Sequence, residues 1–291
     1  MDKNVTVHNA DKYSLCVIGT GPRSGTWFSA FIFKYLDQLL GEGAEVTEEV
    51  IYVTFSILEN LKIIKLHGHL VCPGFIENPD IEKSSWEELN FHAISYNNVY
   101  HLVEKNPHIF IPTNNDKLRV VYIYRNPLDQ CISMYNHHKN HVYEELAEKT
   151  KDVKPLEYAM KFGFESWIKQ YLSYQEMQRI CPNQIQFISY DKLVLNPFDT
   201  FSKMLEFIQP NHQISPELIE KSVELSAPTR IKKIEQKHER SLASDQTDPT
   251  LSHIKSPLPG NWKKYYSSQD IKKAEAYFSR FGLNLGDFQA E

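Results

Sequence analysis

The chain has 291 residues, of which 41% are apolar, 12% aromatic and 24% charged, as is usual for a globular protein with a sizeable core. Its formal net charge is −5 and its sequence pI is about 6.2, so a broad nucleic-acid-binding face is not expected and any basic site must be local. The sequence shows no signal-peptide pattern and no apolar run of the ~20 residues that a membrane helix needs, which predicts a cytoplasmic protein without a membrane span.

Cysteine and histidine spacing gives no metal signature. The two histidines His137 and His141 are four residues apart, but the H-E-x-x-H pattern of a zinc protease is absent, and we predict no metal site. The cysteines lack C-x-x-C spacing, which favours reduced residues in the core or in helices. These cysteines are Cys16, Cys72, Cys131 and Cys181.

Segment 14–28 predicts a strand, a glycine-containing turn and the start of a helix. The apolar run 15–18 has the length and branching of a buried strand, and the turn follows at 19–26. Apolar residues then recur at spacings of three and four, which predicts one face of an amphipathic helix. They are Phe28, Phe31, Ile32, Tyr35, Leu36 and Leu39.

This turn is a candidate anion site. A helix that starts directly after it directs free backbone N–H groups at whatever lies above the turn, and Arg23, Ser24 and Thr26 add donors suited to phosphate oxygens. The Lys of a G-x-x-x-x-G-K-[ST] motif is missing, and so is a G-x-G-x-x-G pattern. A tight turn with incidental polar residues remains the alternative at this point.

A second β-rich run, 61–66, ends at His67. Because ligands in open α/β sheets lie beyond the carboxyl ends of the strands, Lys65 and His67 are expected next to the anion site. A histidine there can act as a general base, since its ordinary pKa of about 6.5 is near neutral pH. A solvated loop histidine is the alternative, and neither His67 nor His69 can be chosen from this run alone.

Two further strands end in polar residues. The run 118–124 leads into Arg125 and then into a helix whose first turn holds Pro127, and Ser133 lies about two turns along that helix. The run 184–191 predicts a further strand, which ends in Tyr190 and Asp191. Three strand-to-helix units with intervening helices predict a parallel sheet flanked by helices on both faces, in a single domain over 1–291. The polar stretch 229–254 is expected to be mobile or solvated and is a candidate lid.

In this order the motifs resemble the cytosolic-type sulfotransferases, which transfer a sulfuryl group from 3′-phosphoadenylyl sulfate (PAPS) to a hydroxyl or an amine. Segment 21–27 looks like the family's 5′-phosphosulfate loop, and 124–133 looks like its 3′-phosphate element. Segment 65–67 matches a Lys and a catalytic His two residues later. Segment 189–197 is similar to the strand end whose Tyr contacts the nucleotide, and 255–266 keeps the family's Gly-x-Trp-Lys core as Gly260-Asn-Trp-Lys263.

The resemblance implies a P-loop-type α/β fold, PAPS as co-substrate, adenosine 3′,5′-bisphosphate (PAP) as product, and no metal. It implies His67 as general base, with Lys65 and Arg23 stabilising the transferred group and the leaving phosphate. It also implies a set of residues that bind the nucleotide. These are Arg23, Ser24, Gly25, Thr26, Trp27, Phe28, Arg125, Ser133, Tyr190, Lys255 and Ser256.

The chain departs from the family pattern at three points. Arg23 stands where the animal enzymes carry Lys, which replaces a point donor with a fork. The adenine-stacking Trp falls at Trp27 or at Phe28, depending on a one-residue shift. The C-terminal Arg-Lys-Gly is reduced to Lys255 and Ser256 before a proline, so the second half of the family's 3′-phosphate motif is matched only by these two residues.

Two other classes of function are considered. A P-loop kinase would need a metal-binding carboxylate, for which Asp191 is the nearest candidate, and the missing loop Lys argues against it. A non-catalytic nucleotide-binding module is the other, and Lys65 with His67 argues against that. The aromatic-rich region 70–112 admits a small molecule, a glycan or a carrier-bound chain as acceptor, and a homodimer is compatible with the sequence.

Overall fold

The computed structural model describes residues 14–21, 23–41, 57–58, 61–67, 93–94, 101–102, 118–139, 147–210, 214–237 and 258–289. The described strands form a five-stranded sheet in the order β2-β3-β1-β6-β7 and a two-stranded sheet of β4 and β5. Their bounds are β1 Ser14–Thr20, β2 Ile57–Leu58, β3 Leu61–His67, β4 Ala93–Ile94, β5 His101–Leu102, β6 Leu118–Tyr124 and β7 Ile185–Ser189. Four strands of the larger sheet are parallel, and β2 pairs with β3 antiparallel.

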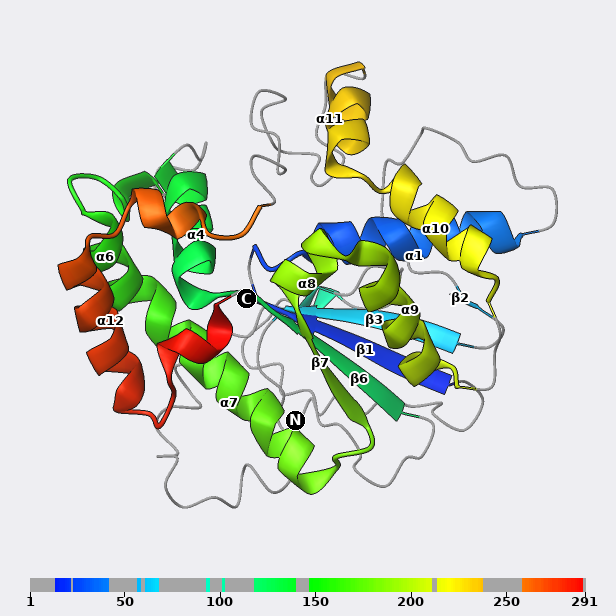
Figure 1. The fold of residues 1–291 in the computed structure, drawn as a ribbon, viewed down its shortest axis with the longest axis horizontal. Helices are drawn as coiled ribbons and strands as arrows, with labels where there is room; N and C mark the ends of the chain where they lie inside the picture. Colours follow the sequence, from blue (N-terminus) through cyan, green and yellow to red (C-terminus); the bar gives the residue numbers. More distant parts are fainter. Residues whose placement is uncertain are drawn as a thin grey trace.

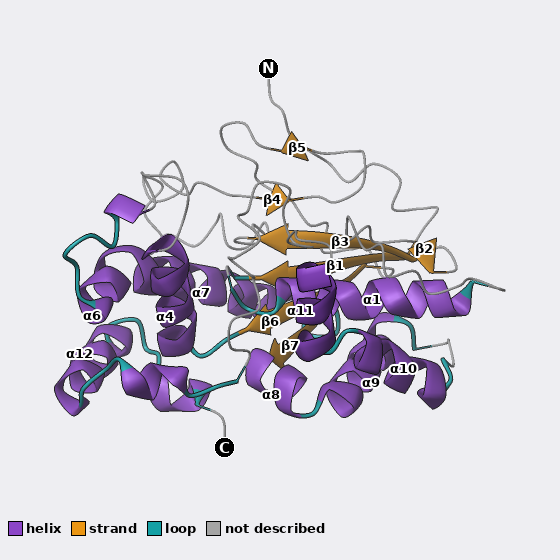
Figure 2. Cartoon of the chain, turned by 90° about the horizontal axis from the view of Figure 1, so that it is seen from above, coloured by secondary structure: helices purple, strands orange, loops and turns teal. Residues whose placement is uncertain are grey.

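The register of the parallel strands brings their carboxyl ends to one edge. Thr20 pairs with His67 on one side and with Ile123 on the other. Tyr124 in turn pairs with Ser189. Figure 2 shows β1 and β3 pointing to the same edge of the sheet. Residues that follow β1, β6 and β7 therefore start from neighbouring positions, which fulfils the main geometric requirement for a shared site.

One face of the sheet carries the larger apolar core. Helix α1 (Thr26–Leu40) packs with α9 (Pro197–Ile208), α10 (Pro216–Leu225) and α11 (Pro228–Lys237) over the inward residues of β1, β6 and β7. Figure 1 shows α1, α9 and α10 on this side of the strands, with the short α8 (Tyr190–Leu195) leading from β7 to α9. Alternate residues of β6, Val121 and Ile123, face this core, as the period of two in a strand requires.

The other face is covered by α7 (Phe164–Ile180), whose rings meet those of the sheet. Tyr122 of β6 stacks on Tyr174 with ring centroids 3.8 Å apart, and Phe187 of β7 meets Tyr122 edge to face at 5.4 Å. Helices thus cover both faces, which confirms the predicted architecture. Tyr174 also reaches the backbone of Gly19, where a Cβ atom would lie 2.0 Å from its hydroxyl oxygen.

A second apolar cluster lies beside the sheet, where Figure 1 shows α4, α6, α7 and α12 grouped together. Helix α4 is Pro127–Lys139, and α6 (Pro155–Tyr158) continues through the π-helical turn η1 (Ala159–Gly163) into α7. Gly163 faces Cys131 of α4 at a spacing that leaves no room for a Cβ atom. The C-terminal part adds η2 (Asn261–Lys264), α12 (Ser268–Ser279) and η3 (Leu285–Phe288).

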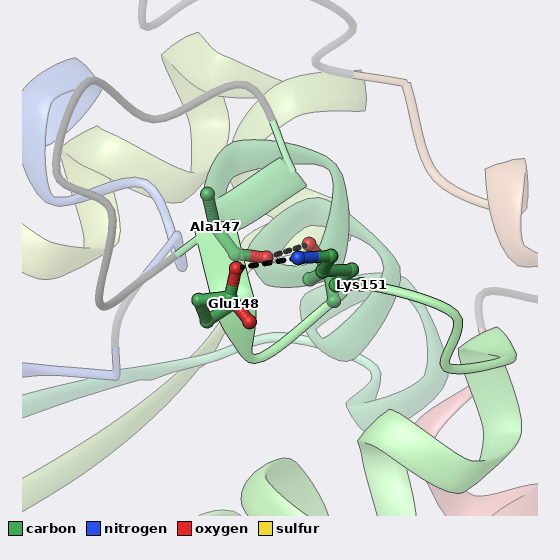
Figure 3. A network of polar contacts seen from close by, with 4 residues as sticks. Ala147, Glu148 and Lys151 are labelled. Atoms are coloured by element: carbon green, nitrogen blue, oxygen red, sulfur yellow. Dashed lines mark hydrogen bonds and ion pairs between the residues drawn. The ribbon is translucent and has the colours of Figure 1, made fainter.

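Two polar segments, 228–237 and 147–154, fall within the described part of the chain. Residues 228–237 form α11, in which Ile231 and Ile234 are buried in the larger core, so the start of the expected mobile stretch is ordered helix. Residues 238–254 lie outside the described part. Segment 147–154 carries several exposed charged side chains, and in it Lys151 forms an ion pair with Glu148 at 3.1 Å (Figure 3). The hydroxyl of Thr150 donates to the carbonyl of Ala147 at 2.8 Å.

The described cysteines Cys16, Cys131 and Cys181 are buried free thiols, and Cys72 lies outside the described residues. Among the helices that the structure describes, none has the length and apolarity needed to cross a membrane.

Candidate functional site

The turn between β1 and α1 passes through the left-handed region of backbone conformation at Arg23, with φ of 64°, and again at Gly25. Gly25 precedes α1 with φ of 84°, and a Cβ atom there would lie 2.5 Å from Cδ2 of Tyr190. The first helical hydrogen bond runs from the N–H of Ser29 to the carbonyl of Gly25 at 3.0 Å. The N–H groups of residues 26–28 precede that bond, so they form the positive end of the helix that the sequence predicted.

Helix α4 and the end of β6 hold this turn by hydrogen bonds. Nε of Arg23 donates to Oγ of Ser133 at 3.1 Å, and a terminal nitrogen of Arg125 donates to the carbonyl of Arg23 at 3.0 Å. The hydroxyl of Ser24 donates to Oε1 of Gln130 at 2.7 Å. The 5′-phosphosulfate loop and the 3′-phosphate element of the sequence analysis therefore meet in one place.

Arg125 is a buried cation at the centre of this place. It is 4% exposed, and its guanidinium carbon lies 4.6 Å from the ring centroid of Tyr190. Its Nε has no hydrogen-bond partner among the described atoms, and no described carboxylate forms an ion pair with it. Burial, and then the neighbouring charge of Arg125, lower the pKa of Arg23 to about 10. Two guanidinium groups held together in this way favour an anion between or above them.

Two buried carboxylates, those of Asp129 and Asp191, are near the guanidinium of Arg125. Both oxygens of Asp129 accept backbone N–H groups, from Gly260 at 2.6 Å and from Trp262 at 2.9 Å, which fixes the C-terminal segment on α4. Asp191 is 3% exposed and its Oδ1 has no partner among the described atoms. Burial, and then the charge of Asp129, raise the pKa of Asp191 to about 6, although Arg125 acts in the opposite direction.

Backbone contacts fix the end of β6 as well. The indole N–H of Trp167 donates to the carbonyl of Arg125 at 2.9 Å, and the side chain of Asn126 accepts the N–H of Leu128 at 2.9 Å. Asn126 thereby satisfies one of the free donors at the start of α4. Arg125 is held from both sides, so its guanidinium projects from a rigid position.

The structure brings together seven of the predicted site residues, directly or through one neighbour. They are Arg23, Ser24, Gly25, Thr26, Arg125, Ser133 and Tyr190. The hydroxyl of Thr26 is hydrogen-bonded to the hydroxyl of Thr20, at 2.7 Å. Phe28 is half-buried against the larger core.

Other predicted residues are placed only in part. Lys65 pairs with Ile18 and His67 with Thr20 in the sheet register, so their backbones end next to the turn, but their side chains lie outside the described atoms. The side chain of Trp27 also lies outside them. So do Lys255 and Ser256 as whole residues.

Sequence reasoning missed Gln130 and Asp129, which are 4% and 2% exposed. Gln130 is three residues before Ser133 and therefore on the same helix face, which is the one signal that pointed to it. Gln170 of α7 was missed too. A Cβ atom on Gly21 would lie 2.9 Å from Nε2 of Gln130 and 2.9 Å from Oε1 of Gln170. The two side chains therefore pack against the turn at this glycine.

Several known proteins share sequence or fold with the chain. "Cytosolic sulfotransferase 12" of Arabidopsis thaliana is 24% identical over 215 residues, which cover 68% of this chain and 56% of that protein. The chain thus spans little more than half the length of this curated relative.

Two solved structures have the same fold. Mouse sulfotransferase SULT7A1 complexed with PAP matches with a TM-score of 0.55 and 14% identity, over 96% of this chain and 88% of that one. Retinol dehydratase in complex with androsterone and the inactive cofactor PAP matches with a TM-score of 0.52 and 15% identity, over 92% and 80%. At this identity the likeness shows the fold.

The model of the sulfotransferase domain family matches residues 15–288, nearly the whole chain, and it takes in both strand ends that carry Arg23 and Arg125. The chain therefore belongs to the sulfotransferase domain family.

Proposed function

We propose that the chain is a PAPS-dependent sulfotransferase that transfers a sulfuryl group to a hydroxyl or an amine of its acceptor. The observation that carries the proposal is the buried guanidinium of Arg125, which lies beside Arg23 and whose Nε has no hydrogen-bond partner among the described atoms. A buried unpartnered donor on a cation is costly unless a ligand satisfies it. That PAP is bound in both solved structures above supports the same proposal.

The residues present fit PAPS. Arg23 and the N–H groups at the start of α1 are assigned to the 5′-phosphosulfate, because a helix N-terminus and a guanidinium both favour an anion. Arg125 and Ser133 are assigned to the 3′-phosphate. Tyr190 is assigned to the nucleotide, since its ring already packs on Arg125. Lys255 and Ser256 remain proposed contributors to the 3′-phosphate site.

Catalysis is proposed to rest on positioning and on charge. The acceptor oxygen or nitrogen attacks the sulfur, the bond from sulfur to the bridging phosphate oxygen breaks, and PAP leaves with the electron pair. His67, which ends β3 next to Thr20, takes the acceptor proton. Lys65 and Arg23 stabilise the negative charge that develops on the bridging and equatorial oxygens. No metal is required in this scheme.

The proposed acceptor is a small molecule, a glycan or a carrier-bound chain. Of the residues expected to surround it, 70–112, the structure describes only 93–94 and 101–102. We propose a single domain acting in the cytoplasm, with 238–254 as the remainder of a lid. The name of the Arabidopsis relative supports the compartment. An acceptor screen with labelled PAPS tests the activity directly.

Replacement of the proposed base separates binding from chemistry. His67→Ala should bind PAP as the unchanged protein does and lose ~10²–10⁴-fold in turnover, which is the usual contribution of a general base. Isothermal titration with PAP and a steady-state assay measure the two effects. His69→Ala is the matched control and should keep its turnover. Full activity in His67→Ala would assign the base elsewhere.

A nucleotide titration separates the proposal from a kinase. PAP should bind with the same affinity with and without EDTA, and ATP with magnesium should bind more weakly. Tighter binding of ATP that EDTA abolishes would favour the phosphotransferase alternative, with Asp191 as its metal-binding carboxylate.

A further inference from the structure

We propose that Gln130 is a positioning residue that holds the phosphate-binding turn in its ligand-binding shape through Ser24. The inference rests on the proposed function, because the turn is the part assigned to the 5′-phosphosulfate. Gln130 does not itself touch the ligand in this proposal. It acts through the loop that does.

The hydrogen bond between the side chains of Ser24 and Gln130 is short and shielded from water. The hydroxyl of Ser24 lies 2.7 Å from Oε1 of Gln130, and the two residues are 0% and 4% exposed. A buried hydrogen bond of this kind costs more to remove than an exposed one, because water cannot replace the lost partner. The bond joins residues 106 positions apart, so it fixes the turn relative to α4 rather than relative to its own strand.

The same amide also touches the first residue of the turn. A Cβ atom on Gly21 would lie 2.9 Å from Nε2 and 3.1 Å from Oε1 of Gln130. The N–H of Ser24 closes the turn by donating to the carbonyl of Gly21 at 3.2 Å. Gln130 thus supports both residues that this internal bond joins, and its position sets where the intervening Arg23 points.

This arrangement gives Ser24 a different role from the one that its sequence position suggests. A hydroxyl has a single proton, and that of Ser24 is donated to Gln130 inside the protein, away from solvent. The bond therefore leaves ligand contact to Arg23 and to the backbone N–H groups of the turn. Ser24 secures them instead.

Two residues on one face of α4 accept hydrogen bonds from two consecutive residues of the turn, Arg23 and Ser24. Gln130 accepts from Ser24, and Ser133, one helical turn further on, accepts from Nε of Arg23 at 3.1 Å. Because Ser133 is also assigned to the 3′-phosphate, α4 connects the proposed sites of both phosphates. A shift of the turn along α4 would change the distance between those sites. PAP, whose two phosphates must reach both sites, would then bind more weakly.

A double-mutant cycle on the full chain tests the proposal. Ser24→Ala, Gln130→Met and the double variant are titrated with PAP by calorimetry, and their thermal unfolding is followed without ligand. Each single variant should weaken PAP binding ~10-fold. The double variant should be no weaker than either single one, because the interaction is lost once. Ser222→Ala, which removes a buried hydroxyl that donates to the carbonyl of Ile219 in its own helix α10, is the matched control and should bind PAP normally.

The outcomes are distinguishable. Failure of the unchanged protein to bind PAP would overturn the proposed function and this inference together. If the unchanged protein binds PAP, equal affinity in Ser24→Ala would overturn the inference alone, and this mild variant covers the case in which Gln130→Met does not fold. Effects of the two single variants that multiply in the double variant would mean that Ser24 contacts the ligand directly. Coupling seen in unfolding but not in PAP affinity would leave Gln130 as a stabilising residue only, which also contradicts the proposal.

Discussion

Arg125 shows how a single side chain can be costly to the fold and necessary to a ligand. Its guanidinium is buried, lies 4.6 Å from the ring of Tyr190, and forms no ion pair with a described carboxylate. Desolvation of a charge costs several kcal/mol. The hydrogen bond to the carbonyl of Arg23, the contact with the ring of Tyr190 and the charge of Asp191 each offset part of that cost. The ligand-free protein therefore carries a cost that an anion removes.

Arg125→Met should separate these two effects. We expect PAP affinity to fall ~100-fold or more, since charged hydrogen bonds to the 3′-phosphate are lost. The free energy of unfolding without ligand should stay equal to that of the unchanged protein or exceed it, because the buried charge is removed. Calorimetric titration and urea unfolding measure the two. Arg119→Met, at the opposite end of β6, is the control and should bind PAP normally.

Asp191 should give the fold a pH dependence of its own. Its pKa rises from 3.8 to about 6 on folding, so the folded protein binds the proton more tightly than the unfolded chain does. The stability that this proton contributes is fully present below pH 3.8 and is lost as the pH rises through about 6.

Asp191→Asn should remove that dependence, because an amide keeps the size of the side chain but does not titrate. The free energy of unfolding of the variant, relative to the unchanged protein, should therefore increase between pH 4 and pH 7. Urea unfolding at several pH values checks this. A constant difference for Asp191→Asn would mean that this carboxyl is charged throughout the range.

At the scale of the element, the start of α1 is fixed by one glycine. Gly25→Ala meets two penalties, the positive φ of 84° and the ring of Tyr190 at 2.5 Å. Gly282→Ala meets only the first, because its φ is 70° and no atom lies within 4 Å of the added Cβ. Gly282→Ala is therefore the control, and it should lose ~1 kcal/mol of stability because the left-handed backbone conformation is unfavourable for any L-residue with a Cβ atom.

Gly25→Ala should lose clearly more stability than Gly282→Ala, and it alone should weaken PAP binding, because Tyr190 must move. Thermal unfolding and PAP titration of both variants measure the difference. Equal losses in the two variants would show that Tyr190 yields without cost and that the contact does not shape the site.

The sequence predicted β1, β3 and β6 and the edge at which they end, whereas the short strands β2, β4 and β5 were not predicted. The apolar, β-branched runs 15–18, 61–66 and 118–124 all fall within observed strands, because a buried parallel strand needs just that pattern. Arg23, Arg125 and Tyr190 lie close together at this edge for a general reason, since parallel strands carry their carboxyl ends together.

The sequence did not predict the supports of the site or one of the helices. Gln130 and Asp129 bond to residues more than 100 positions away, and such contacts leave no local pattern. Helix α11 was missed because it has only two inward apolar residues, Ile231 and Ile234, among mostly polar ones. Tertiary packing against the larger core, rather than propensity, makes that segment helical.

On the scale of the whole molecule, the two apolar clusters meet at the proposed nucleotide site. The larger one contains α1, and the second contains α4 and α7. The hydrogen bonds from Arg23 and Ser24 to α4 cross between them. A ligand that binds both elements should therefore stabilise both clusters together.

PAP at 100 times its dissociation constant should add about 2.7 kcal/mol to the free energy of unfolding, which raises the melting temperature by several degrees. Differential scanning calorimetry should show one transition that shifts as a whole. Two transitions, of which PAP moves only one, would instead mean that the clusters unfold independently.

The bond from the indole of Trp167 to the carbonyl of Arg125 has a practical consequence. An indole that is 1% exposed emits at short wavelength, and its emission responds to changes in its own hydrogen bond. The protein thus contains an intrinsic fluorophore connected to its central cation. Changes in emission on titration should follow occupancy of the site without any added dye, and Trp167→Phe should abolish that part of the signal.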